Sequence, residues 1–131
     1  MIGLDSNIIV RYLTQDDPLQ AAQAGEVIEQ RLSEEEPGFI SVVAMAEIVW
    51  TLTRFYRFPS ARIVGALERI LAVDILVIEN EAEVFVAMSA LRDGRDEFGD
   101  ALIGALSAAA GCSRVLTFDR GALALPGFAM P

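Results

Sequence analysis

The chain has 131 residues, of which 53% are apolar and 22% are charged, so it has the composition of one ordinary globular domain and not of a disordered protein. Nineteen acidic residues against ten arginines give a net charge of −9, which argues against a plain DNA-binding domain. The chain has no histidine, no lysine and a single cysteine, which excludes Ser-His and Cys-His nucleophile pairs, Schiff-base lysines, disulfides within the chain and structural zinc sites.

Short apolar runs alternate with helical patterns along the chain. Capping residues help to place the helix starts: Asp17 precedes Pro18, Ser41 precedes an apolar helical pattern, and Asn80 stands three residues before Glu83 as a capping pair. In chain order we predict a strand at 2–4, helices at 6–13 and 18–33, a strand at 38–40, helices at 42–52 and 60–72, a strand at 75–78, helices at 81–91 and 98–110, and a strand at 115–118. This alternation predicts an α/β fold, with a mostly parallel sheet covered by helices on both faces.

The start of the chain, MIGLDSNIIVRYL, has an acid at position 5 and lacks the basic beginning of a secretion signal. No apolar run reaches the length needed to cross a bilayer. We therefore expect a cytoplasmic protein without a membrane span, and a single domain over residues 1–131.

Four acids are placed where a site is expected. Asp5 and Asp119 directly follow the first and last predicted strands, and ligand sites in α/β sheets lie beyond the carboxyl ends of the strands. Glu47 and Asp100 lie in apolar stretches without an arginine within one helical turn on the same face. An unpaired buried carboxylate costs several kcal/mol, so a cation is needed nearby. Converging carboxylates that hold Mg²⁺ or Mn²⁺ would meet this need.

At these acids the sequence resembles the PIN-domain ribonucleases, and more narrowly the VapC-type toxins of type II toxin–antitoxin pairs. The matching segments are LDSNIIV, SVVAMAEIVWTL, FGDALIGALSAAAG and VLTFDR, in that order and across nearly the whole chain. Each segment alone is a weak signal, and their order and spacing make the combination specific. The resemblance implies a three-layer α/β/α domain with a central parallel sheet of four or five strands.

The resemblance also implies the site and its chemistry. Asp5, Glu47, Asp100 and Asp119 would be both the catalytic residues and the metal ligands, with Asn7 and Thr117 as polar neighbours that orient them. The activity implied is hydrolysis of phosphodiester bonds in RNA by a Mg²⁺- or Mn²⁺-dependent endoribonuclease. The partners implied are an RNA substrate, a second copy of the chain in a homodimer, and a small antitoxin protein.

Each acid also has a purely structural interpretation. Asp5 and Asp119 are suited to cap the helices that follow them, Asp100 suits the first turn of a helix, and Glu47 can be an exposed helical acid. Asp96 and Glu97 stand within one helical turn of Asp100, and the start of that helix decides whether they join the site.

The segment 54–58, RFYRF, interleaves arginines with aromatic residues. This pattern suits stacking on RNA bases, and it equally suits a helix end packed at a subunit or partner interface. Two other functions stay open for the whole chain. One is a PIN-like module without activity that acts through protein–protein assembly, against which the four acids argue. The other is a phosphatase or receiver domain, against which the missing lysine argues.

Overall fold

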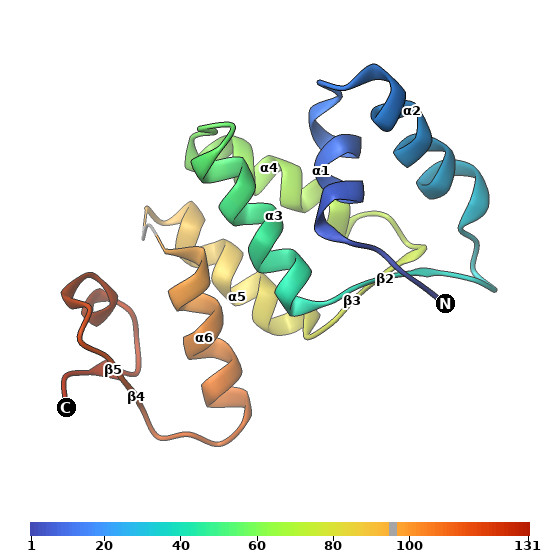
Figure 1. Ribbon diagram of the computed structural model, residues 1–131. Coiled ribbons are helices and arrows are strands. Elements are labelled where there is room, and N and C mark those ends of the chain that lie inside the picture. The colour runs from blue at the N-terminus through green and yellow to red at the C-terminus, as the bar shows by residue number, and fades with distance from the viewer. Residues whose placement is uncertain (95–96) are drawn as a thin grey trace. The chain divides into compact units, whose positions relative to one another are not determined.

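The computed structural model describes residues 1–94 and 97–131, and the chain divides into two compact units (Figure 1). The first unit is Met1–Glu79 and the second is Asn80–Pro131. In the described parts of the chain, no helix combines the length and the apolar composition that a membrane span requires.

A three-stranded parallel sheet organises the first unit. Its strands are β1 (Ile2–Gly3), β2 (Gly38–Ile40) and β3 (Leu76–Ile78), in the order β1-β2-β3. The predicted strand positions are therefore confirmed here, with the first and third slightly shorter than expected. Gly38 lies in the central strand, where a Cβ atom would come within 2.9 Å of methyl groups of Leu4, Leu32 and Leu76, so these side chains would have to shift to admit a larger residue.

Four α-helices and one π-helical turn complete the first unit. The capping predictions hold, since the side chain of Asp17 accepts from the backbone N–H of Gln20 at 3.0 Å and that of Ser41 accepts from Ala44 at 3.1 Å. The helix predicted over 18–33 ends earlier, because its last turn is π-helical and Leu32 is extended and buried. The elements are α1 (Ser6–Thr14), α2 (Pro18–Glu26), η1 (Val27–Arg31), α3 (Val42–Arg54) and α4 (Ser60–Leu71).

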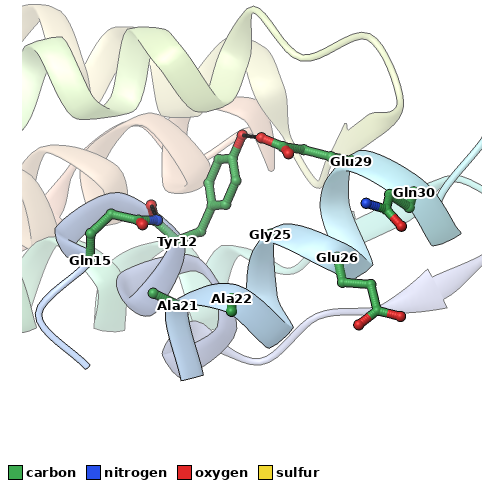
Figure 2. Close-up of a pocket in the computed structure, with 8 residues that line it drawn as sticks. All are labelled: Tyr12, Gln15, Ala21, Ala22, Gly25, Glu26, Glu29 and Gln30. Carbon is green, nitrogen blue, oxygen red and sulfur yellow. Dashed lines mark hydrogen bonds between the residues drawn. The ribbon is translucent and has the colours of Figure 1, made fainter. Parts of the chain in front are cut away.

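Helix α1 packs against both α2 and α3, and α3 packs against α4 (Figure 1). The hydroxyl of Tyr12 donates to Glu29 Oε1 at 3.1 Å, across a polar hollow of about 430 Å³ between α1 and the segment formed by α2 and η1 (Figure 2). The start of α3 is tied to the end of β3, because the Glu79 carboxylate accepts from the Val42 N–H at 2.9 Å. The largest fully buried side chains of this unit are Ile9, Ile40, Met45, Ile48, Leu52, Ile63 and Leu67.

The second unit pairs two helices, α5 (Glu81–Arg92) and α6 (Phe98–Ala109), with a short C-terminal sheet. Asn80 adopts a left-handed conformation with φ of 50° and its side chain caps nothing, so the predicted capping pair with Glu83 is wrong. Its backbone carbonyl accepts from the first N–H groups of α5 instead. The remaining elements are β4 (Val115–Leu116), the 3₁₀ helix η2 (Arg120–Ala124) and β5 (Phe128–Ala129), and β4 pairs with β5 in parallel.

The α/β class with parallel strands is confirmed. The described strands form one set of three and one set of two, so a single central sheet of four or five strands is not confirmed. The strand β5 was not predicted, because its two residues follow Gly127 in a segment too short to carry a periodic pattern.

Candidate functional site

Asp5 lies between the end of β1 and the start of α1 in the first unit. Its Oδ1 atom accepts from the Ser6 N–H at 2.7 Å, so the carboxylate caps α1 as the structural interpretation predicts. The other oxygen, Oδ2, lies 3.4 Å from the Asn7 amide nitrogen, which donates to it. The side chain is exposed, so capping leaves carboxylate lone pairs open to a ligand.

Ser6 joins Asp5 to Glu47. The Ser6 hydroxyl lies 2.8 Å from Glu47 Oε2 and 3.4 Å from Asp5 Oδ1. Because a hydroxyl has one proton, it donates mainly to the closer oxygen, Glu47 Oε2, while the same hydroxyl oxygen also lies near Asp5. Ser6 was not among the predicted site residues. In the sequence, only its position beside Asp5 could have pointed to Ser6 as a site residue, because its other partner, Glu47, is 41 residues away.

Glu47 is exposed, although its apolar flanks suggested burial. The apolar residues of α3 face the other way, and the buried ones are Ala44, Met45, Ile48, Val49 and Leu52. The interpretation as an exposed helical acid is therefore correct, and the contact with Ser6 adds a second partner from α1. Glu47 owes its place to the helix start fixed by Ser41.

The second unit holds another pair of carboxylates, Asp100 and Asp119. Asp100 is half-buried in the first turn of α6. Burial, and after it the negative charge of Asp119, raises the pKa of Asp100 above its ordinary value. Asp119 is exposed and caps η2, with Oδ1 accepting from the Gly121 N–H at 2.9 Å. The Thr117 hydroxyl accepts from the Asp119 N–H at 3.0 Å and so fixes the backbone of this acid.

Glu97 stands at the start of α6, where its exposed side chain makes no capping hydrogen bond. Asp96 lies outside the described residues. The predicted four acids thus fall into two pairs, Asp5 with Glu47 in the first unit and Asp100 with Asp119 in the second.

The donor chemistry of these pairs fits a hard divalent cation. None of the four carboxylates forms an ion pair with an arginine in the described parts of the chain, whereas Asp16 pairs with Arg11 at 3.0 Å. Oxygen ligands of this kind suit Mg²⁺ and Mn²⁺. Among the residues that the structure describes, no group of three or more Asp, Glu, Cys or His side chains could hold an ion on its own. One pair alone is therefore an incomplete ligand set.

The raised pKa of Asp100 leads to a pH-dependent effect on stability. A carboxyl group whose pKa is raised by folding binds its proton more tightly in the folded state. Its ionised form therefore lowers the free energy of unfolding fully at neutral pH, and this penalty disappears as the pH falls to the ordinary carboxyl pKa of 3.8. In EDTA we expect Asp100→Asn to melt at a higher temperature than the wild type at neutral pH. The gain should shrink as the pH is lowered.

Thermal melts of both proteins across this pH range, with the exposed Asp93→Asn as control, measure the difference. A lower melting temperature for Asp100→Asn at neutral pH would mean that the N-terminus of α6 favours the carboxylate more than burial penalises it.

A search of curated proteins finds no match to this chain. The PIN domain family matches residues 2–127, which include all four acids. The chain therefore belongs to the PIN domain family, whose members are generally nucleases that act on RNA and typically use divalent metal ions.

Proposed function

We propose that this protein is a divalent-metal-dependent endoribonuclease, in which Asp5, Glu47, Asp100 and Asp119 together hold Mg²⁺ or Mn²⁺. The observation that carries the proposal is the presence of two carboxylate pairs that have no arginine partner among the described residues. Like charges held close together raise the free energy of the metal-free protein, and a cation offsets that cost. Membership of the PIN family supports a nuclease in particular.

When bound, the ion supplies Lewis acidity, which lowers the pKa of a water molecule and offsets charge on the scissile phosphate. The protein supplies the ligands and their orientation. Ser6 donates to Glu47 and so fixes its carboxylate, and the Asn7 amide donates to the outer oxygen of Asp5. Thr117 fixes the backbone of Asp119. Groups that orient metal ligands in this way typically change affinity or activity by about 10- to 100-fold when removed.

The activity can be tested by mapping RNA ends. Purified protein is incubated with total RNA in Mg²⁺, in Mn²⁺ or in EDTA, and the ends of the products are sequenced. We expect cuts within RNA chains that leave 5′-phosphate and 3′-hydroxyl ends, and only in the presence of metal. Cleavage that persists in EDTA would contradict the proposal, and an absence of cleavage in both metals would favour the non-catalytic assembly module.

Metal binding has a readout that does not depend on activity. A ligand that binds only the folded protein stabilises it, by about 2.7 kcal/mol at a free concentration 100-fold above its Kd. We therefore expect millimolar Mn²⁺ to raise the melting temperature by several degrees relative to EDTA. The double variant Asp5→Asn with Asp100→Asn should lose most of this rise. An equal rise in the double variant would place the ion elsewhere.

The finer proposal is that the nuclease is the toxin of a type II toxin–antitoxin pair. The order and spacing of the four matching segments support it, as does the similarity to VapC-type toxins that these segments carry. On this proposal the protein is a cytoplasmic homodimer with a three-layer α/β/α fold and one central sheet, and a small antitoxin binds it. Induced expression in bacteria should arrest growth, and unimpaired growth with active enzyme present would remove the toxin role.

A further inference from the structure

A pocket of about 240 Å³ lies between α1 and the end of α3 in the first unit. We call it the α1–α3 pocket. Its α1 wall begins at Ser6 and Asn7, which contact Glu47 and Asp5, so the pocket starts beside the first carboxylate pair. The residues that line it are Ser6, Asn7, Val10 and Arg11 on α1, together with Thr51, Phe55 and Tyr56 at the end of α3.

Phe55 is an exposed aromatic residue held in place by its neighbours. Its side chain is 74% exposed, and its ring packs edge-on against Tyr56 at a centroid distance of 5.1 Å. Tyr56 is anchored in turn, because its hydroxyl donates to Asp16 Oδ2 at 2.7 Å and accepts from Arg11 Nη1 at 3.0 Å. A fixed and exposed ring of this kind is suited to stack on a planar base.

Arg11 supplies oriented donors to the same pocket. Its Nε donates to Gln20 at 2.8 Å, and its Nη1 donates to Asp16 and Tyr56 at 3.0 Å each. The other terminal nitrogen, Nη2, forms no hydrogen bond with a described residue. The guanidinium group is therefore held rigidly with one edge available, which is how arginine recognises a phosphate oxygen.

The local charge around the end of α3 differs from that of the whole protein. Residues 48–67 contain three arginines and no acid, a local charge of +3 in a chain of net charge −9. These arginines are Arg54, Arg57 and Arg62, and Arg62 stacks over the ring of Phe58 at 3.7 Å. Asp16 contacts this region and is paired with Arg11. This local excess of arginine reduces the repulsion that an anionic strand meets from the acidic protein, which favours nucleic acid at this end of α3.

From these observations we infer that the α1–α3 pocket is a subsite for one nucleotide of single-stranded RNA next to the scissile bond, with its base on Phe55 and a phosphate oxygen on Arg11. The inference rests on the proposed nuclease function. Arg11 lies five helical steps after Ser6 on α1, a rise of about 7.5 Å, which is close to the length of one nucleotide and much shorter than a docked helix. A helix-binding groove needs a long and continuous apolar lining, whereas this pocket is short and polar side chains (Ser6, Asn7, Arg11 and Thr51) interrupt its apolar surface.

The test measures binding without metal and without cleavage. The full chain in EDTA is titrated with each nucleoside 5′-monophosphate and with ribose 5-phosphate, and the backbone amide resonances are followed by NMR. We expect the nucleotides to shift the amides of Asn7, Arg11, Thr51 and Phe55. Ribose 5-phosphate, which lacks a base, should bind at least about 5-fold more weakly, because stacking supplies that much affinity or more.

Variants identify the stacking residue. Phe55→Ala should weaken nucleotide binding by about 5-fold or more, and Phe55→Tyr should restore it. Phe85→Ala, which removes an exposed phenylalanine of α5, should bind as the wild type does. Unchanged affinity in Phe55→Ala, or equal binding of ribose 5-phosphate, would overturn the subsite. The subsite would also be overturned if nucleotides did not bind at the α1–α3 pocket and a second copy of the chain covered it instead.

The outcomes separate the subsite from the nuclease function. If the wild type cuts RNA and Phe55→Ala cuts it with an unchanged KM, the subsite is wrong and the nuclease proposal stands. If nucleotides bind at the α1–α3 pocket and RNA is not cut in Mg²⁺ or Mn²⁺, the subsite stands and the nuclease proposal is wrong.

Discussion

Replacing either Asp5 or Asp100 by Asn is expected to lower the rate of RNA cleavage by about 100-fold or more, because on the proposed function each change removes one charged metal ligand and several kcal/mol of transition-state stabilisation. The fold should persist. Asn caps a helix about as well as Asp, so Asp5→Asn keeps the start of α1 intact. Cleavage rates in Mn²⁺, measured beside circular dichroism melts, check both expectations.

Asp17→Asn is the matched control for this experiment. Asp17 caps α2 as Asp5 caps α1, and the same substitution removes the same charge in the same unit. Its cleavage rate should stay within about twofold of the wild type, since surface changes away from a site have small effects. Similar losses in Asp5→Asn and Asp17→Asn would mean that general charge, and not a ligand set, controls the activity. Full activity in Asp5→Asn would point to a contaminating nuclease or a wrong assignment.

Replacing Ile40 by Ala should cause a large loss of stability in the first unit. Ile40 is fully buried in the central strand β2, and truncation of such a side chain lowers the free energy of unfolding by about 2–5 kcal/mol. The following residue, Ser41, caps α3, so the loss is expected to loosen the start of the helix that carries Glu47. Denaturant unfolding of the metal-free protein measures the change.

Val77 provides the comparison on the same sheet. It lies in β3 beside β2 but is 41% exposed, so Val77→Ala removes less buried surface and should cost less than about 1 kcal/mol. Ile40→Val should fall between the two, at about 0.5–1.5 kcal/mol. Equal losses for Ile40→Ala and Val77→Ala would contradict the core position of β2.

Local chemistry made much of the fold predictable. Asp17 before Pro18 and Ser41 before an apolar helical pattern mark real helix starts, because side-chain caps act over two or three residues. Apolar runs likewise located β1, β2 and β3. The strand β5 and the π-helical turn η1 were missed, since neither depends on a pattern that repeats within its own few residues.

The candidate site, which stays a prediction, rests on a different kind of signal. The acids were found from their positions after strands and within apolar stretches, and similarity to a known family selected them together. The link through Ser6 was not predictable, because a hydrogen bond to Glu47 across 41 residues exists only after α1 and α3 have packed. Likewise the burial that raises the pKa of Asp100 depends on its surroundings in the folded chain, not on its neighbours in sequence alone.

The double role of Asp5, as helix cap and as proposed ligand, has a genetic consequence. One G-to-A transition changes an Asp codon to an Asn codon, and the amide preserves the cap while it removes the charge. A single nucleotide change can therefore give an allele whose protein still folds and accumulates but lacks the proposed ligand. If the proposed toxin role is right, such alleles should be recovered among survivors of induced expression, alongside truncations and promoter losses.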